Sequence, residues 1–196
     1  MSQFGTRQTG FFGGSGGAVP PVSTSIIVLG AGTCSTMRCG VSNTALDSYS
    51  AALSGLCNTA SGLYSVISGG AFNNTFSSYS VVAGGNFNTA SGYSSVVSGG
   101  RQNTASGRYS GVLTGFCNTA SGDKSTISGG YSNTASSCYS VISGGGFNTT
   151  SGGYCSTISG GTNNTTSGNQ SVVSGGKYNI ASVSYTHLTL PTIYSV

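Results

Sequence analysis

The sequence predicts an all-β fold, a parallel β-solenoid of about nine 15-residue coils. Three observations favour it: a fixed 15-residue repeat, a β-branched residue at one position of that repeat, and Gly-Gly pairs at another. A short fixed period is typical of a solenoid, because a single repeat cannot bury its apolar face without its neighbours. No heptad or other helical periodicity competes with this interpretation.

Asparagines mark the start of each repeat. From each asparagine the unit is close to N-T-A-S-G-x-Y-S-V-[VI]-S-G-G-x-x. Stacked asparagines form hydrogen-bonded ladders and tolerate left-handed backbone, so we expect them at a corner of each coil. The asparagines spaced by 15 residues are Asn43, Asn58, Asn73, Asn88, Asn103, Asn118, Asn133 and Asn148, and one extra residue then shifts the phase to Asn164 and Asn179.

The ninth residue after each asparagine predicts the core. It is β-branched in most coils, as expected for a short strand that packs inward. The predicted core stripe consists of Ile67, Val82, Val97, Val112, Ile127, Ile142 and Val173. Alanine two residues after most asparagines indicates a narrow interior opposite this stripe. The Gly-Gly pairs supply the positive φ that tight corners need.

The chain divides into four segments. Residues 1–25 form a Gly-rich leader, residues 26–41 a lead-in or capping segment, and residues 42–182 the repeat solenoid. The run VSYTHLTLPT (183–192) resembles the translated transposon-end adapter of sequencing libraries. We therefore expect residues 183–196 to be a non-native tail that does not continue the repeat stacking, and the chain to be a fragment.

Composition argues against several function classes. Only 4% of residues are charged, and the charges that make up the net +4 are scattered, whereas nucleic-acid binding needs clustered Lys and Arg. Catalysis needs titratable groups that converge. Asp47 and Asp123 are about five coils apart, roughly 24 Å at strand spacing, and the one histidine, His187, lies in the tail. We expect no enzyme activity, catalytic residue, cofactor or metal site, and no membrane span, since the apolar run Ile26 to Leu29 is too short.

Aromatic residues recur at two positions of the repeat. Exposed apolar stripes of this size usually mark an interface, so we expect them to pack between chains of an oligomer. The alternative is an exposed aromatic surface for contact with a glycan or a host. The candidate interface consists of Tyr49, Tyr64, Tyr79, Tyr109, Tyr139 and Tyr154 at one position, and of Phe72, Phe87 and Phe147 at the other.

A Thr-x-Ser pattern offers an alternative binding face. With the intervening alanine pointing inward, threonine and serine would point outward in a flat array. This pattern resembles the threonine arrays of β-solenoid ice-binding proteins, and it implies a monomeric module that presents a Thr/Ser face to ice or glycan. The face consists of Thr59, Ser61, Thr89, Ser91, Thr104, Ser106, Thr119, Ser121, Thr134 and Ser136.

The units ASGLYSVISGG (60–70) and ASGYSSVVSGG (90–100) resemble the head repeat of YadA-like trimeric adhesins, a repeat class that also occurs in phage and virus fibre proteins. The A-S-G, Ser-Val and Gly positions match the family pattern A-x-G-x-x-S-V-A-I-G-x-x-A. The alternating V-x-I does not, because two adjacent apolar residues are followed by Ser here. The resemblance implies a left-handed parallel β-roll, a homotrimer, and a non-catalytic structural or attachment role. It further implies a surface appendage or virion as location, with a cell-surface receptor or glycan as partner.

No signal peptide is visible at the N-terminus of the sequence.

Overall fold

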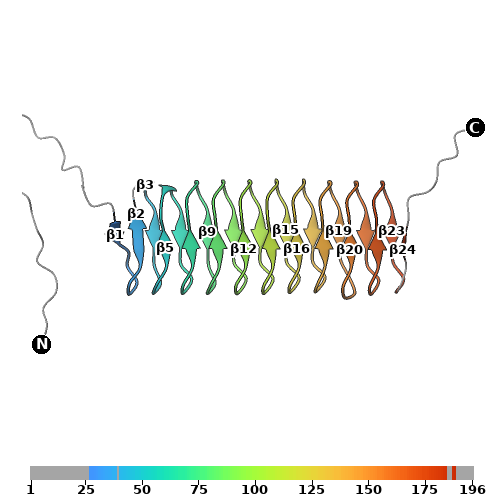
Figure 1. Ribbon diagram of the computed structural model, residues 1–196, viewed down its shortest axis with the longest axis horizontal. Helices are drawn as coiled ribbons and strands as arrows, with labels where there is room; N and C mark the ends of the chain where they lie inside the picture. The colour runs from blue at the N-terminus through green and yellow to red at the C-terminus, as the bar shows by residue number, and fades with distance from the viewer. Residues whose placement is uncertain (1–26, 39, 185–186, 189–196) are drawn as a thin grey trace, which may run out of the picture.

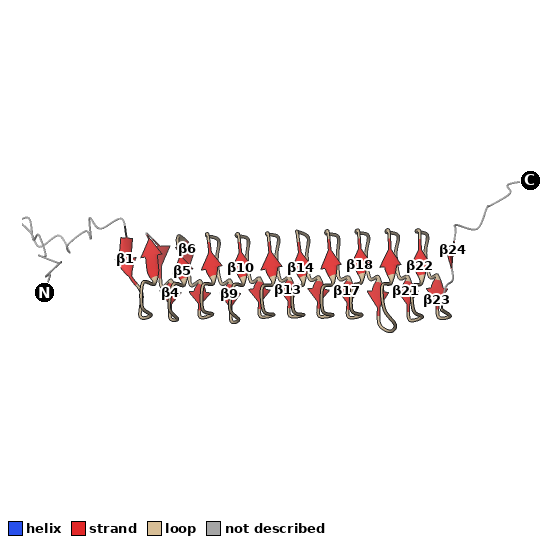
Figure 2. Ribbon diagram, turned by 60° about the horizontal axis from the view of Figure 1, so that its bottom comes forward, coloured by secondary structure: helices blue, strands red, loops and turns tan. Residues whose placement is uncertain are grey.

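The computed structural model describes residues 27–38, 40–184 and 187–188, and the predicted leader (1–25) lies outside them. Within the described residues the chain forms a rod of stacked β coils without a helix (Figure 1). Each coil contributes one short strand to each of two sheets, which run along the rod on opposite sides of the interior (Figure 2). The predicted all-β parallel solenoid of 15-residue coils is therefore confirmed.

The larger sheet has 12 strands in the described part of the chain. They are β1 (Ile27–Leu29), β2 (Thr36–Arg38), β5 (Ala51–Ala52), β8 (Val66–Ile67), β10 (Val81–Val82), β12 (Val96–Val97), β14 (Gly111–Val112), β16 (Thr126–Ile127), β18 (Val141–Ile142), β20 (Thr157–Ile158), β22 (Val172–Val173) and β24 (His187–Leu188). All neighbours pair in parallel except β1, which runs antiparallel to β2 and covers the N-terminal edge of this sheet.

The second sheet has ten parallel strands, again within the described residues. They are β4 (Thr44–Ala45), β7 (Thr59–Ala60), β9 (Asn74–Thr75), β11 (Thr89–Ala90), β13 (Thr104–Ala105), β15 (Thr119–Ala120), β17 (Thr134–Ala135), β19 (Thr149–Thr150), β21 (Thr165–Thr166) and β23 (Ile180–Ala181). A short pair, β3 (Gly40–Val41) and β6 (Gly55–Leu56), lies at one corner near the N-terminal end. The lead-in segment thus supplies β1, β2 and β3 and joins the stack.

The asparagines form a continuous ladder inside the rod. The backbone N–H of Asn103 donates to Oδ1 of Asn88 at 3.0 Å, and its side-chain Nδ2 donates to the carbonyls of Gly99 and Gly115 at 3.0 and 2.8 Å. Both asparagines are fully buried. A buried polar group lowers the stability of the fold unless it is hydrogen-bonded. Each asparagine side chain therefore favours the one alignment of neighbouring coils in which its hydrogen bonds can form.

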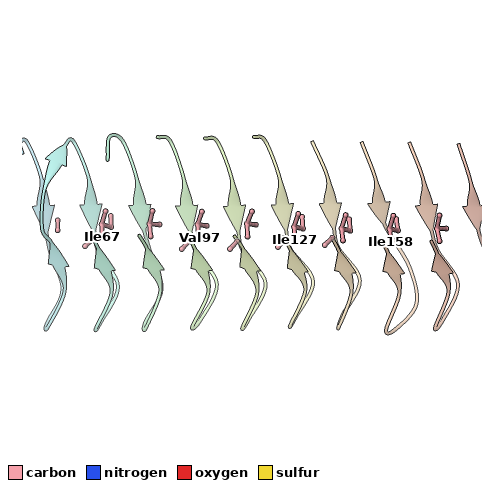
Figure 3. Packing of buried hydrophobic residues seen from close by; sticks show 14 of the residues in the cluster. Ile67, Val97, Ile127 and Ile158 are labelled. Carbon is pink, nitrogen blue, oxygen red and sulfur yellow. The ribbon is translucent and has the colours of Figure 1, made fainter. Parts of the chain in front are cut away.

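In β4, β5 and β7 to β23 the second residue of each strand faces the interior (Figure 3). In β3 and β6 the second residues, Val41 and Leu56, are exposed instead. All seven residues of the predicted core stripe are fully buried, and alanines such as Ala90 and Ala105 pack in the same cluster. Ile158 also belongs to this stripe, although the sequence analysis omitted it. The omission has a simple cause: in that coil the inserted residue moves the core position to the tenth residue after Asn148.

The inserted residue is accommodated in the corner between β19 and β20, where Figure 2 shows a wider loop. Gly153 there has a φ of 74°. After it, Tyr154 pairs with Cys138 in a β-bridge, and Cys155 takes the left-handed conformation that Tyr139 has in the preceding coil. The expectation that Tyr154 shares the repeat position of the other tyrosines is therefore wrong, because the insertion shifts it by one residue.

The expectation that residues after Ser182 do not continue the stacking is wrong for β24. His187 pairs with Val172 and Leu188 with Val173, 15 residues apart as in the coils before. The edge of β22 presents backbone N–H and C=O groups that need partners, and a following segment at the right spacing can supply them. Residues 185–186 and 189–196 lie outside the described residues.

Candidate binding surfaces

Tyrosines line the corner that leads from the ten-stranded sheet into the 12-stranded sheet. Tyr64 has a φ of 57°, a left-handed conformation that is uncommon outside glycine. Its ring stacks on Tyr49 at 4.7 Å and on Tyr79 at 5.2 Å between ring centroids. The strand spacing of ~4.8 Å brings equivalent rings to stacking distance, so one tyrosine per coil produces a continuous ladder.

Tyr93 extends this ladder past a coil that lacks the usual tyrosine. Ser94 occupies the tyrosine position there, and Tyr93 makes edge-on contacts with Tyr79 and Tyr109 at 5.6 and 5.7 Å. The sequence analysis missed Tyr93 because it stands one position earlier in the repeat. We call the exposed set the tyrosine corner: Tyr49, Tyr64, Tyr79, Tyr93, Tyr109, Tyr139 and Tyr154.

Aromatic residues also line the opposite corner. Phe72 and Phe87 stack at 4.8 Å, and Tyr131 contacts Phe116 at 5.5 Å and Phe147 at 4.9 Å. We call Phe72, Phe87, Phe116, Tyr131 and Phe147 the phenylalanine corner. All three predicted phenylalanines are exposed, whereas Phe116 and Tyr131 were missed because they occupy the neighbouring repeat position.

The outer side of the ten-stranded sheet carries the predicted Thr-x-Ser array, here called the hydroxyl face. Thr89 is aligned with Thr104 in the next coil, and Thr119 with Thr134. The predicted threonines are partly buried, and the predicted serines range from partly buried to exposed. Asn74 and the exposed Phe76 interrupt the array in one coil.

The outer side of the 12-stranded sheet is mostly apolar at the first position of its strands. From β5 to β22 in this sheet, the first residue of each strand faces outward while the second faces the core, so the adjacent apolar pair of the repeat is divided between the two sides. The outward residues include Val66, Val81, Val96, Val141 and Val172, here called the valine row, and Gly111, Thr126 and Thr157 interrupt it. These valines are partly exposed, and Val96 reaches 37%. The sequence analysis did not predict this surface.

A cavity of about 200 Å³ opens on the tyrosine corner. Its lining consists of Arg108, Tyr109, Asp123, Lys124, Cys138, Tyr139 and Tyr154. Lys124 occupies the position that a tyrosine holds in the neighbouring coils, so the ladder has no ring between Tyr109 and Tyr139. The cavity therefore lies where the aromatic ladder is interrupted.

Two cations border this cavity and both contact tyrosines. Lys124 Nζ donates to the Tyr139 hydroxyl at 2.7 Å and lies 4.6 Å from the centre of its ring. That hydrogen bond raises the pKa of Lys124. The Arg108 guanidinium lies 4.9 Å from the Tyr109 ring centre and 5.3 Å from that of Tyr93.

Within residues 27–38, 40–184 and 187–188, no group of three His, Cys, Asp or Glu could hold a metal ion. In the same residues, no helix has the length and apolar character needed to cross a membrane. Five cysteines, Cys34, Cys57, Cys117, Cys138 and Cys155, are free thiols. Comparison with protein families and with curated protein sequences finds no match for this chain.

Proposed function

We propose that this chain is a non-catalytic structural and attachment module, one of three identical chains in a surface adhesin or a tail fibre. The observation that carries the proposal is the alignment of exposed nonpolar side chains into rows along a rod. Stacked coils repeat each outward residue at ~4.8 Å, so a single apolar residue per coil becomes a long apolar row. Contiguous exposed apolar surface usually marks an interface with another molecule.

The valine row and the phenylalanine corner are the surfaces best suited to contacts between chains. Valines on the outer side of a sheet present short, stiff side chains in a flat array, and phenylalanine carries no polar atom that would need a partner. The tyrosine corner instead combines rings with hydroxyls and charges, which suits a polar ligand. This division narrows the sequence-based expectation, which placed both aromatic stripes between chains.

The resemblance to the head repeat of trimeric adhesins supports the same proposal. The outward valine of β8, Val66, stands at the Ser-Val position that matches the family pattern, whereas the inward Ile67 stands where that pattern has Ala. A rod that associates along its length and keeps one corner free would display that corner at a distance from the particle or cell that carries it.

The proposal is tested by sedimentation of the full chain. We expect a trimer for the native sequence and smaller species for Val81→Asp/Val96→Asp/Val141→Asp, because three charges would be buried between copies. A matched control places the same three charges on the hydroxyl face, as Thr89→Asp/Thr104→Asp/Thr134→Asp, and should keep the mass of the trimer. A monomeric native chain, or equal dissociation of both variants, would reject assembly through the valine row.

A variant with serine at Tyr64, Tyr79, Tyr109 and Tyr139 tests whether the tyrosine corner also lies between chains, as the sequence analysis expected. If only the valine row and the phenylalanine corner lie between chains, this variant sediments as the native chain does. Dissociation of the tyrosine variant would place the tyrosine corner at the interface as well.

A second candidate function rests on the hydroxyl face. Its threonines are aligned in register from coil to coil, which gives a regular outward array of methyl and hydroxyl groups. This regularity supports a monomeric module that binds ice or glycan. Ice recrystallisation in the presence of the native chain and of Thr104→Leu/Thr119→Leu tests it. A native chain that leaves ice growth unchanged would eliminate ice as the ligand of this face.

A further inference from the structure

The irregularities of the repeat gather at one place on the tyrosine corner. Three of the chain's charged residues, Arg108, Asp123 and Lys124, stand in two successive coils, although only eight residues of the sequence are charged. The inserted Gly153 lies two coils further on and sets the place of Tyr154. Residues from four consecutive coils line one cavity of about 200 Å³, and two of these coils depart from the repeat at this corner, one by Lys124 and one by the inserted residue.

The walls of this cavity are aromatic and tilted toward one another. The rings of Tyr139 and Tyr154 lie 5.7 Å apart with an interplanar angle of 32°, whereas Tyr49 and Tyr64 are almost parallel at 6°. Tyr109 bounds the cavity on the other side of Lys124. The three tyrosines remain about half exposed. Lys124 lies over the Tyr139 ring and Arg108 over the Tyr109 ring, so a ligand can contact the ring surface that these cations and the neighbouring ring leave uncovered.

The charged groups leave donors and an acceptor free for a ligand. Lys124 uses one of its three N–H donors on the Tyr139 hydroxyl, and Arg108 donates from Nη2 to the Tyr109 hydroxyl at 3.3 Å. Asp123 accepts the backbone N–H of Arg108 at 3.1 Å through Oδ1, which leaves Oδ2 available. In the described part of the chain both cations have tyrosine partners and neither forms a salt bridge, and with the Asp123 carboxylate the cavity carries two positive charges and one negative charge.

We propose that this cavity binds one carboxylated sugar residue of a glycan. The apolar C–H face of a pyranose ring fits against an aromatic ring face, and the sugar carboxylate can accept charge-assisted hydrogen bonds from Arg108 and Lys124. Asp123 Oδ2 would accept a sugar hydroxyl. The inference rests on the proposed attachment function, because it names the chemical class to which the free corner attaches.

The size and shape of the cavity favour a single sugar over larger ligands. Its volume lies below the roughly 300–1,000 Å³ of pockets that enclose drug-sized molecules. An acidic peptide would meet the two cations equally well but would leave the tilted tyrosine rings without a matching flat apolar face. A glycan instead places one ring in the cavity and lets the rest of the chain run along the exposed tyrosine ladder.

Ligand-observed NMR titration of the full chain tests the inference with three small probes. Methyl β-D-glucuronide or methyl α-N-acetylneuraminide should bind at least about tenfold more tightly than the neutral methyl β-D-glucoside, as one charge-assisted hydrogen bond allows. Binding of either carboxylated probe supports the inference and distinguishes a uronic acid from a sialic acid. Affinity for the glucoside equal to that for both acids would overturn it, as would acetate alone binding as tightly.

Variants locate the binding. Arg108→Gln/Lys124→Gln should weaken binding of the carboxylated probe about tenfold or more, whereas the control Lys177→Gln should leave it unchanged. Lys177 also lies over a tyrosine ring, at 4.8 Å from the centre of Tyr178, but outside the cavity. Likewise Tyr139→Leu should weaken binding and Tyr64→Leu should not. Equal effects of cavity and control variants would overturn the inference.

All residues that line the cavity come from one chain. The sugar-binding inference and the trimer proposal can therefore be rejected independently of each other. A monomeric chain that still binds the carboxylated probe would reject the trimeric assembly and support the cavity. A trimer that binds none of the probes would reject the sugar inference and leave the assembly proposal in place.

Discussion

The two sheets of the rod share one interior and differ on their outer sides. Strands such as β12 and β13 each direct their second residue, Val97 and Ala105, into the same buried cluster. Their first residues face outward, and there the 12-stranded sheet presents Val96 while the ten-stranded sheet presents Thr104. The inward residues therefore determine the fold, and the outward residues distinguish a surface suited to association from one suited to water or a polar ligand.

The largest expected effect removes a side chain from the shared interior. Ile127→Ala should lower the free energy of unfolding by about 2–5 kcal/mol, because it leaves a cavity among fully buried residues. Its outward neighbour provides the control: Thr126→Ala should change the free energy of unfolding by about 0.5 kcal/mol or less. Chemical denaturation followed by circular dichroism measures both. Similar losses for the two variants would contradict the assignment of inward and outward positions.

The adjacent residues Asn73 and Asn74 allow the inward and outward positions to be compared for a polar side chain. Asn73 is fully buried, and its side chain donates to Gly85 O at 2.9 Å and accepts from the Asn88 backbone N–H at 2.9 Å. Asn73→Ala leaves that buried N–H unpaired and should cost about 2–4 kcal/mol. Asn74→Ala, on the outer side, should cost about 0.5 kcal/mol or less. Thermal unfolding of the two variants compares them, and an equal decrease in Tm would refute the buried ladder.

The smallest expected effect concerns the corner that joins the two sheets. The hydrogen bond to Tyr139 raises the pKa of Lys124, so this contact is present at neutral pH and is lost as the pH rises through the raised pKa. NMR titration should give a lower pKa for Lys124 in Tyr139→Phe than in the native chain. An unchanged pKa would mean that the hydroxyl does not contact the ammonium in solution.

The interior could be predicted from the sequence more fully than the outer sides. A strict spacing of asparagine and of valine or isoleucine constrains which residues face inward, because every coil must bury the same set. The valine row escaped prediction because its repeat position also holds Gly111, Thr126 and Thr157, so it does not form a continuous apolar pattern along the sequence. Ile158 was omitted and Tyr154 was misplaced because the position of a one-residue insertion depends on which corner can accommodate it, here the one at Gly153.

The cavity at the tyrosine corner depends on residues that no single repeat unit contains. Arg108, Lys124 and Tyr154 are far apart in sequence, and only the stacking of coils at a fixed spacing brings them together. Each looks like a scattered exception when the repeat is read along the chain. Position in the stack, rather than a local motif, makes them a candidate site.

Photo-crosslinking from the two outer faces tests the central claim most directly. The photoreactive residue p-benzoylphenylalanine is placed once at Val96, on the 12-stranded sheet, and once at Thr104, on the ten-stranded sheet. If copies associate through the valine row, irradiation crosslinks chains to one another from position 96 and leaves the position-104 protein as single chains. Crosslinking from position 104 alone, or from neither position, would contradict that account.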